Sequence, residues 1–517
     1  MKTLRIFLEI LLTFILLLLF AAWYFLSPIQ LDKLLATISQ EISSLTLLPV
    51  ATSGKLELKL FPLPSLHLPH IEVGQRDITA YFIQLDDINL KLRLKPLFKK
   101  KLIFKLVQAK QFAIQVNKAS TAHTSSISPI SINIAAINKA DLLIEKVIFN
   151  KGSVEIALSP NILRAENLEL LAENVTVVDD FPLALKGFLS YGDSKNTPIA
   201  AEIYFKGETN LPDNMFTDKA LSLNDLKFYG LLEANSIKFK QFNVDKLVAK
   251  VNANGGDVLF KPMAMNLYEG NAAGYLHIDT ATGKFYLNQN AVNLNSKLFF
   301  AKYFPKLNIV GPLDFALQAQ FNLAEANIPQ SLTGNGSLLL KNGSINDFNL
   351  HVVLELIRKK IDQLLKIIKD SSNAELGADN ITINPNAYKG QSKFSLFGLR
   401  FAIQHQDVVV NSFIFNAEEL QLTGMGRYNL ASDEIYANLQ AKFDTGDQDV
   451  NDISRMLGGA FPVKVTGSVK DPDISPDLEK ITPYLQQLVV KKVIQAPTDV
   501  VQQQIFQFFH VLPLKNP

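Results

Sequence analysis

The sequence predicts a mostly β protein, with an N-terminal transmembrane helix followed by a long series of strands that have one apolar side. The first observation is the alternation of Leu with charged residues in "GKLELKLF", residues 54–61, because strand side chains change face at every residue. The second is a long succession of short strand patterns separated by Asn, Gly, Asp and Pro. The third is a long apolar run near the N-terminus. Two helical patterns, one inserted near 347–369 and one at the C-terminus, complete the predicted fold.

The apolar run covers residues 10–26, "ILLTFILLLLFAAWYFL", and with the residues from 6 onward it makes a helix of about 31 Å, enough for a bilayer core. Lys2 and Arg5 precede the run, and Trp23 and Tyr24 stand at its far end, where aromatic residues favour the membrane interface. The positive-inside rule places this N-terminus in the cytoplasm and the residues beyond Ser27 outside. A cleaved signal peptide is the alternative, but the run is longer than usual and bulky residues precede the possible cleavage points.

The segments after this anchor follow from changes in pattern. Leu and Ile at helical spacing in 28–47 predict an amphipathic helix, and strands are predicted after it at 55–60, 87–95, 102–107 and 112–116. A Ser/Thr-rich stretch, "ASTAHTSSISPIS", reads as a linker before a long β-rich region. The predicted organisation is an anchor (1–27), a helix plus β module (28–118), a linker (119–131), a central β-rich groove (132–345), an amphipathic helix (346–372), a second β module (373–475) and C-terminal helices (476–517).

The apolar side of the first strands is the predicted groove wall. Lys side chains occupy the alternate positions of these strands and form the solvent-exposed side. Lys at the edge of a sheet also disfavours pairing with another chain. Periodicity cannot distinguish an open trough from a closed sandwich, so both remain possible at this point. The candidate groove residues are Leu56, Leu58, Leu60, Leu66, Leu68, Ile88, Leu90, Leu92 and Leu94.

Two helical segments interrupt the β pattern. The segment 347–369 has an apolar stripe flanked by Arg and Lys, which is compatible with contact to anionic lipid or with a helix that plugs the end of a sheet. The segment 477–511 is divided by Pro483 and Pro497. Both are predicted to be helical.

Composition and motifs argue against an enzyme. The 51 Lys and Arg nearly balance the 49 Asp and Glu, so bulk charge does not favour nucleic acid as a partner. Cysteine is absent, which excludes disulfides and thiolate metal sites. His67 and His70 have metal-like spacing but lie in a strand pattern, and no phosphate-binding loop or nucleophile elbow is found. We therefore expect no catalytic residue, no metal and no cofactor.

Several stretches occur in an order that resembles the AsmA family of bacterial envelope proteins. They are "GKLELKLFPLPSLHLPHIEVG", "INLKLRLKPLFKKKLIFKLVQAKQFAIQV", "VNANGGDVLFKPMAMNLYEGNAAGYLHID", "LTGNGSLLLKNGSINDFNL" and "FPVKVTGSVKDPDISPD". The linker departs from the family because it lacks a Gly-x-x-Asn-Trp element. The positions that carry the resemblance are Phe61, Pro62, Pro96, Leu97, Leu267, Tyr268, Gly270, Gly334, Gly336, Gly343, Pro462, Gly467 and Pro472.

The resemblance implies a role in the cell envelope. The family is similar to TamB and to the bridge-like lipid carriers of eukaryotes, whose first segment resembles the module at 28–118. The resemblance also implies an elongated, bent antiparallel β-sheet that forms an apolar groove. The protein would then be a single-pass inner-membrane protein with its bulk in the periplasm, which binds phospholipid along the groove and moves it towards the outer membrane. A second hypothesis is an anchored adaptor or scaffold for outer-membrane assembly proteins, without lipid transport.

Overall fold

The computed structural model of the 517-residue chain describes most of the strands and a few helical residues. The predicted anchor lies outside the described residues, and so do the two predicted long helices apart from Asn349, Asp477, Glu479 and Lys480. In the part of the chain that is described, no helix has the length and apolar character needed to cross a membrane. The described residues are 35–36, 39–40, 42–43, 48–59, 63–79, 81–97, 102–117, 142–158, 161–176, 178–192, 199–211, 227–239, 242–303, 308–322, 328–346, 349, 390–443, 454–455, 457–468, 471–477 and 479–480.

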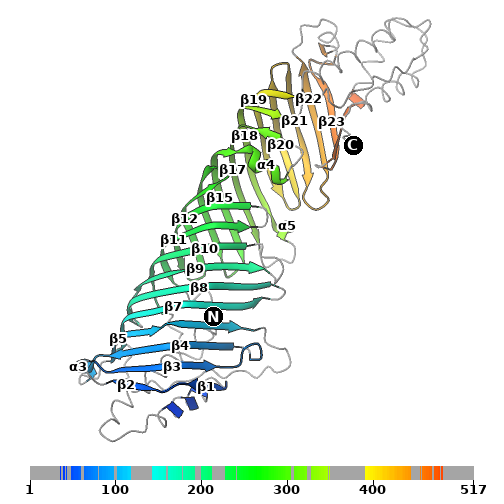
Figure 1. Cartoon of the computed structure of the whole chain (residues 1–517). Helices are drawn as coiled ribbons and strands as arrows, with labels where there is room; N and C mark the ends of the chain where they lie inside the picture. Colours follow the sequence, from blue (N-terminus) through cyan, green and yellow to red (C-terminus); the bar gives the residue numbers. More distant parts are fainter. Residues whose placement is uncertain are drawn as a thin grey trace, which may run out of the picture. The chain divides into compact units, whose positions relative to one another are not determined.

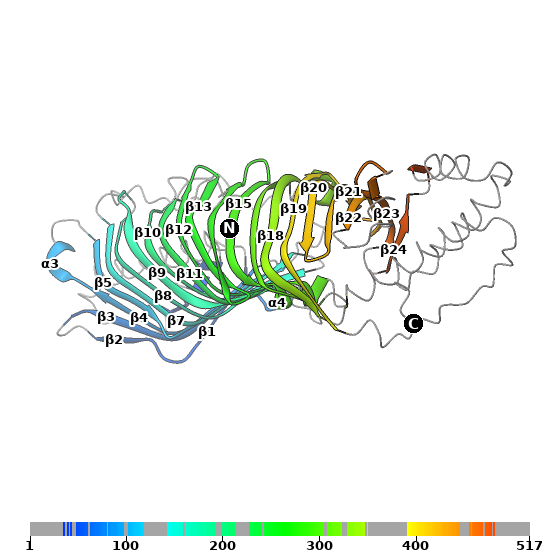
Figure 2. The same ribbon diagram turned by 90° about the horizontal axis from the view of Figure 1, so that it is seen from above.

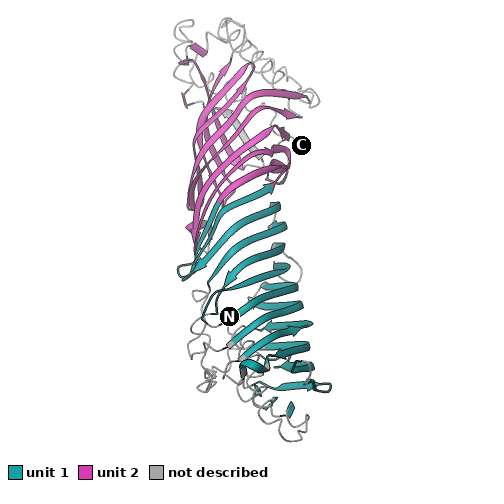
Figure 3. Ribbon diagram, turned by 90° about the vertical axis from the view of Figure 1, so that its left-hand side faces the viewer, with its two compact units in different colours: residues 1–266, 275–283 teal, residues 267–274, 284–517 magenta. Residues whose placement is uncertain are grey.

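The chain forms two compact units, both built almost entirely of strands (Figures 1 and 3). Unit 1 comprises residues 1–266 and 275–283, and unit 2 comprises 267–274 and 284–517. The predicted mostly β fold class is therefore confirmed. The predicted domain boundaries stay a prediction.

Unit 1 contains a sheet that grows from its N-terminal strands towards β13. Its order is β1 and β2 beside β3, then β4, then β5 and β6, and then β7 to β13 in sequence. A one-turn helix, α3 (Leu94–Leu97), separates β4 from β5. The strands are β1 (Val50–Ser53), β2 (Glu57–Lys59), β3 (Ser65–Val73), β4 (Tyr81–Leu92), β5 (Leu102–Ala109), β6 (Gln111–Val116), β7 (Leu142–Leu158), β8 (Asn161–Thr176), β9 (Phe181–Gly192), β10 (Ile199–Thr209), β11 (Phe228–Phe239), β12 (Phe242–Asn254) and β13 (Asp257–Leu267).

The sheet of unit 1 is mixed, so the prediction of an antiparallel sheet is wrong for the pairs that β7 makes with β5 and β6. β5 and β6 both pair with β7 in parallel, while both pair with β4 in the antiparallel sense. Parallel neighbours need a long crossover connection, because the chain must return to the same edge before it starts the second strand. Residues 117–141, which include the predicted linker, are that connection.

Unit 2 contains a second succession of antiparallel strands. β15 pairs with β17, and from β17 to β24 each strand pairs with the next in sequence. The short β16 continues the line of β17 and pairs with the end of β18. The elements are β14 (Gly270–Asp279, shared between the units), β15 (Lys284–Asn295), α4 (Ser296–Tyr303), β16 (Asn308–Val310), β17 (Pro312–Asn322), α5 (Ile328–Ser331), β18 (Thr333–Asn346), β19 (Gln391–Gln404), β20 (Asp407–Ala417), β21 (Leu420–Asn429), β22 (Ile435–Phe443), β23 (Phe461–Ser468) and β24 (Asp471–Pro476).

The strands bend along their length, as β8 to β12 in unit 1 and β18 and β19 in unit 2 show (Figure 2). Several register shifts contain a non-glycine residue with positive φ, among them Lys151 (46°), Asn167 (52°) and Asn293 (56°). Such bulges add one residue to one strand of a pair and increase its local bend and twist. Each sheet therefore has a concave and a convex face.

Candidate functional site

One face of the unit 2 sheet is apolar from strand to strand. Residues that are partners in the register lie side by side on the same face, so the pairing defines four rows that cross the strands. Row 1 is Leu294, Leu313, Leu340, Phe397, Phe415, Leu422, Ala441 and Phe461. Row 2 is Ala291, Phe315, Leu338, Leu399, Phe413, Gly424, Leu439 and Val463. Row 3 is Gln289, Leu317, Gly336, Phe401, Val410, Gly426, Ala437 and Val465, and row 4 is Leu287, Ala319, Gly334, Ile403, Val408, Tyr428 and Ile435.

These rows, which we call the unit 2 apolar face, are only partly shielded from solvent. Most of row 1 is buried, whereas most of rows 2 to 4 is half-buried. The opposite face carries Asn, Gln, Lys and Arg, and many of its side chains are exposed, among them Met425 (61%) and Tyr436 (46%), although Leu339 and Ile414 are half-buried. Side chains converge on the inside of a curved sheet and spread on the outside. The apolar face is therefore the concave one.

Helix α4 covers the row 1 side of this face. Its Phe300 is buried, and the ring of Phe299 lies 6.1 Å from the ring of Phe315 in row 2. The Ser296 hydroxyl at its start donates a hydrogen bond of 3.0 Å to the Ile309 carbonyl. Among the described elements of unit 2, the extensive contacts join neighbouring strands or link α4 and α5 to β15, β16 and β17. No second sheet faces rows 2 to 4 within the described elements.

The predicted groove residues of unit 1 lie in a different setting. Leu56, Leu66, Leu68, Ile88, Leu90 and Leu92 are all buried in one cluster, which we call the N-terminal cluster. Helical residues cover it: Ile42 is 0% exposed within it, and Leu35 packs against it. Leu58 is partly buried against the same cluster, Leu94 lies in α3 rather than in a strand, and Leu60 is outside the described residues. That these positions contact lipid stays a prediction.

The predicted membrane-interface residues Lys2, Arg5, Trp23 and Tyr24 lie outside the described residues, as do Phe61 and Pro62. Pro96 and Leu97 lie in α3, the single helical turn between β4 and β5. Pro462 and Gly467 lie in β23, and Pro472 in β24 is the register partner of Gly467.

The motif Leu267, Tyr268 and Gly270 forms a turn. Tyr268 and Glu269 have φ of 47° and 61°, the two positive values of a tight two-residue connection between β13 and β14. A Cβ on Gly270 would come within 2.7 Å of the Asn293 carbonyl oxygen, so only glycine fits there. The Tyr268 ring packs edge-on against Phe299 of α4 at 5.7 Å. The motif thus positions α4 at the side of the apolar face.

The motif glycines of β18 make room for aromatic rings. Gly336 and Phe401 are register partners, and a Cβ on Gly336 would clash with the Phe401 ring. Gly343 stands in the same relation to Phe394. A Cβ on Gly334 would clash with the Gln318 carbonyl oxygen instead. Glycine opposite a large aromatic ring lets the ring cover the neighbouring backbone, which shields it from solvent.

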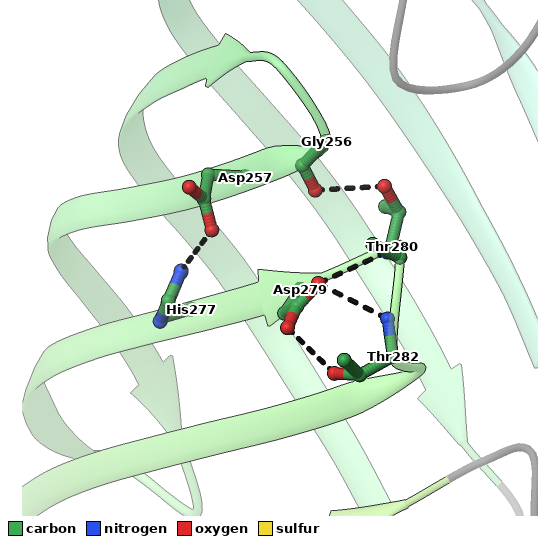
Figure 4. Close-up of polar contacts among 7 residues, drawn as sticks. Gly256, Asp257, His277, Asp279, Thr280 and Thr282 are labelled. Atoms are coloured by element: carbon green, nitrogen blue, oxygen red, sulfur yellow. Dashed lines mark hydrogen bonds and ion pairs between the residues drawn. The ribbon is translucent and has the colours of Figure 1, made fainter.

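Polar groups gather at the hairpins rather than on the apolar face. In unit 1, His277 on β14 contacts Asp257 on β13 at 3.0 Å, with Asp279 nearby at the end of β14 (Figure 4). Asp279 accepts hydrogen bonds from the amides of Ala281 and Thr282 and from the Thr282 hydroxyl, and these bonds, led by the hydroxyl, lower its pKa. Such a carboxylate closes a turn on its own backbone and leaves no base directed at a substrate.

A second polar group lies at the hairpins of unit 2. The Arg427 guanidinium donates a hydrogen bond of 2.5 Å to the Asp407 carboxylate, and the Asn429 amide donates one of 2.9 Å. The bond from Arg427 is the main reason that the pKa of Asp407 is lowered. The Tyr428 hydroxyl donates a 2.8 Å hydrogen bond to Asp433. Burial, followed by this hydrogen bond, raises the pKa of Tyr428 to about 12. Tyr428 is therefore a neutral phenol at the border of row 4.

Histidines and carboxylates do not assemble a metal site in the described residues, where no group of three or more possible ligands is found. His67 and His70 contact Asp87 and Asp86 on the polar side of β3 and β4. These are polar contacts between side chains of neighbouring strands.

The model of the AsmA family matches residues 193–396. This segment belongs to the AsmA family. The family resemblance seen in the sequence is confirmed there, and the segment contains α4, the turn motif at 267–270 and the start of rows 1 to 4. Comparisons with curated proteins and with solved structures gave no match.

The sequence predicted a β-rich groove over 132–345, but none of the apolar side chains of rows 1 to 4 was among the candidate groove residues. The candidate groove residues all lie before residue 95, whereas rows 1 to 4 begin at β15 and share only Gly334 and Gly336 with the positions of the family resemblance. The alternation in "LDFALQAQF" of β17 and in "VVVNSFIF" of β20 is a signal that could have located them. Gln289 had no such signal, because its strand, "KFYLNQNAVNLN", contains several Asn residues that face the other way.

Proposed function

We propose that this protein is anchored in the inner membrane and binds phospholipid in the periplasm on the apolar concave face of its sheet, along which the lipid moves during outer-membrane biogenesis. The observation that carries the proposal is the half-buried state of rows 2 to 4, which are apolar across β15 to β23 and have no second sheet over them among the described elements. A sheet face of this kind in water favours acyl chains by the hydrophobic effect, about 25 cal/mol for each Å² removed from water. Such a function requires no catalytic group.

The match of residues 193–396 to the AsmA family and the mostly β fold are both consistent with a role in the cell envelope. The location and the direction of movement rest on the family resemblance and on the N-terminal apolar run. We expect the purified full-length chain to carry phospholipid in native mass spectrometry. Protein that is free of lipid, and that gains none from phosphatidylglycerol vesicles, would contradict the proposal.

The second candidate function is an adaptor for outer-membrane assembly proteins. It is favoured by exposed apolar side chains on the outer side of β9 to β11, where Phe188, Tyr204, Tyr229 and Leu231 are interspersed with Lys and Glu. Aromatic residues of this kind are enriched at protein interfaces. If the adaptor function holds, changing Tyr229 and Leu231 to Ser will impair the envelope without changing the amount of bound lipid.

A further inference from the structure

Gln289 is an amide among apolar neighbours. It lies in row 3 of the unit 2 apolar face, with Leu287 and Ala291 beside it on β15 and Leu317 opposite on β17. In the four rows, its only polar companion is Tyr428, whose hydroxyl already donates to Asp433. Gln289 is therefore a candidate for recognising a polar group that is surrounded by apolar ones.

The amide of Gln289 has both of its polar atoms buried without a partner. The side chain is 6% exposed, and neither Oε1 nor Nε2 has a hydrogen-bond partner among the described residues. A buried polar group left unpaired is destabilising, and native proteins satisfy nearly all such groups. A ligand that supplies the missing partner recovers this energy when it binds.

Gly274 on β14 leaves room for the amide. A Cβ at residue 274 would lie 2.8 Å from Nε2 of Gln289, so the amide occupies the space that a side chain at 274 would fill. The absence of a side chain at 274 thus allows the Gln289 amide to lie next to β14. The position of the amide is thus built into two neighbouring strands.

We infer that Gln289 donates a hydrogen bond to an ester carbonyl of a diacyl lipid. The inference rests on the proposed function, because the surrounding rows must hold the acyl chains. A glutamine amide offers two N–H donors and one carbonyl acceptor. In a diacyl lipid the ester carbonyls are strong acceptors that lie directly beside the hydrocarbon, as this amide lies beside Leu287, Ala291 and Leu317. Gln289 would thus fix the position of the ester groups along row 3.

The test compares two lipids that differ only at the carbonyls. Dioleoyl phosphatidylglycerol has two esters, and its dioleyl ether analogue has methylene groups in place of the two carbonyls. Binding to the full-length chain is measured by competition with a fluorescent phospholipid. We expect wild-type protein to prefer the ester by about three- to tenfold, the range that one net hydrogen bond supports. Gln289→Leu should bind both lipids with the affinity that wild-type protein has for the ether.

The control Asn290→Ser changes an exposed residue on the opposite face of β15 and should retain the preference for the ester. A wild-type protein without preference, or a preference that survives Gln289→Leu, would overturn the inference while leaving lipid binding intact. A wild-type protein that binds neither lipid would instead overturn the proposed function. Gln289→Met serves as a second variant, and loss of folding in both would show that the amide has a partner in the free protein, which also overturns the inference.

Discussion

The N-terminal cluster and the unit 2 apolar face have the same alternating pattern of apolar residues but different surroundings. In the cluster, Leu66, Leu68 and Leu90 are almost completely buried, and Ile42 from a helical segment packs among them. In rows 2 to 4 of unit 2, Leu399, Phe401 and Phe413 are half-buried. Strand periodicity therefore shows which side of a sheet is apolar. Whether that side is a core or a binding surface depends on what covers it.

The largest difference is expected from a charge placed in the covered cluster. Leu68→Asp puts a carboxylate where no side-chain atom reaches water, which costs about 3–5 kcal/mol and unfolds unit 1 or leaves it poorly folded. Urea denaturation and yield of soluble protein measure the effect. Lys59→Asp, at an exposed side chain on the neighbouring strand β2, is the control and should cost little. A stable Leu68→Asp protein would show that the cluster opens to water.

The same change on the unit 2 apolar face should act on lipid rather than on folding. Leu399→Asp lies between Leu338 and Phe413 in row 2, and its half-buried position lets the carboxylate reach solvent when no lipid is bound. We expect at most about 2 kcal/mol of destabilisation and a loss of bound phospholipid of at least about tenfold. Native mass spectrometry and thermal melting measure the two quantities.

Ser412→Asp is the matched control, because Ser412 is an exposed residue on the opposite face of β20. It should change neither quantity. If Leu399→Asp unfolds unit 2 as Leu68→Asp unfolds unit 1, the two regions are both cores and the comparison fails.

A smaller effect is expected where glycine and phenylalanine fit together. Gly336→Ala adds a Cβ that clashes with the Phe401 ring and lies 2.7 Å from the Ala316 carbonyl oxygen. Either the ring or the strand must shift, at a cost of about 1–3 kcal/mol. Ser337→Ala, on the next residue of β18, should be nearly neutral in the same melting experiment. An unchanged melting temperature for Gly336→Ala would mean that row 3 is loosely packed and adapts freely.

The smallest expected effect is on the pH dependence of the stability of unit 2. The hydrogen bond from Arg427 lowers the pKa of Asp407 in the folded protein, so this ion pair stabilises unit 2 above the ordinary carboxyl pKa and the contribution is lost as the pH falls through the lowered value. Asp407→Asn should therefore lower the melting temperature near pH 6 and change it less near pH 3. A difference between the two proteins that grows at low pH would contradict this assignment.

Sequence reasoning recovered the local features of the fold better than the distant ones. The strands predicted at 102–107 and 112–116 match β5 and β6, because alternation and turn residues are local signals. The strand predicted to reach residue 95 ends at Leu92, since the chain turns through α3. The parallel pairing of β5 and β6 with β7 and the packing of Ile42 onto β3 and β4 depend on contacts between distant segments, and no local pattern encodes them.

The same limit applies to the site. Alternation identified Leu56 to Leu92 as one apolar side, and the structure agrees that most of these residues share one cluster. The partnership of Gly336 with Phe401 requires the register of β18 with β19, whose strands are separated by residues 347–390. Register of this kind is settled by the whole sheet rather than by either strand.

The pairing of consecutive strands in unit 2 also determines how insertions and deletions would change the length of this sheet. From β17 to β24 every strand hydrogen-bonds the strand that follows it, so strands that are consecutive in the sequence are also neighbours in the sheet. Inserting or deleting one hairpin, two strands of about 4.8 Å each, would lengthen or shorten the sheet by roughly 10 Å and preserve the inward orientation of every other side chain. Unit 2 is in this respect an extensible array, whose reach can be adjusted in whole hairpins without redesigning its ends.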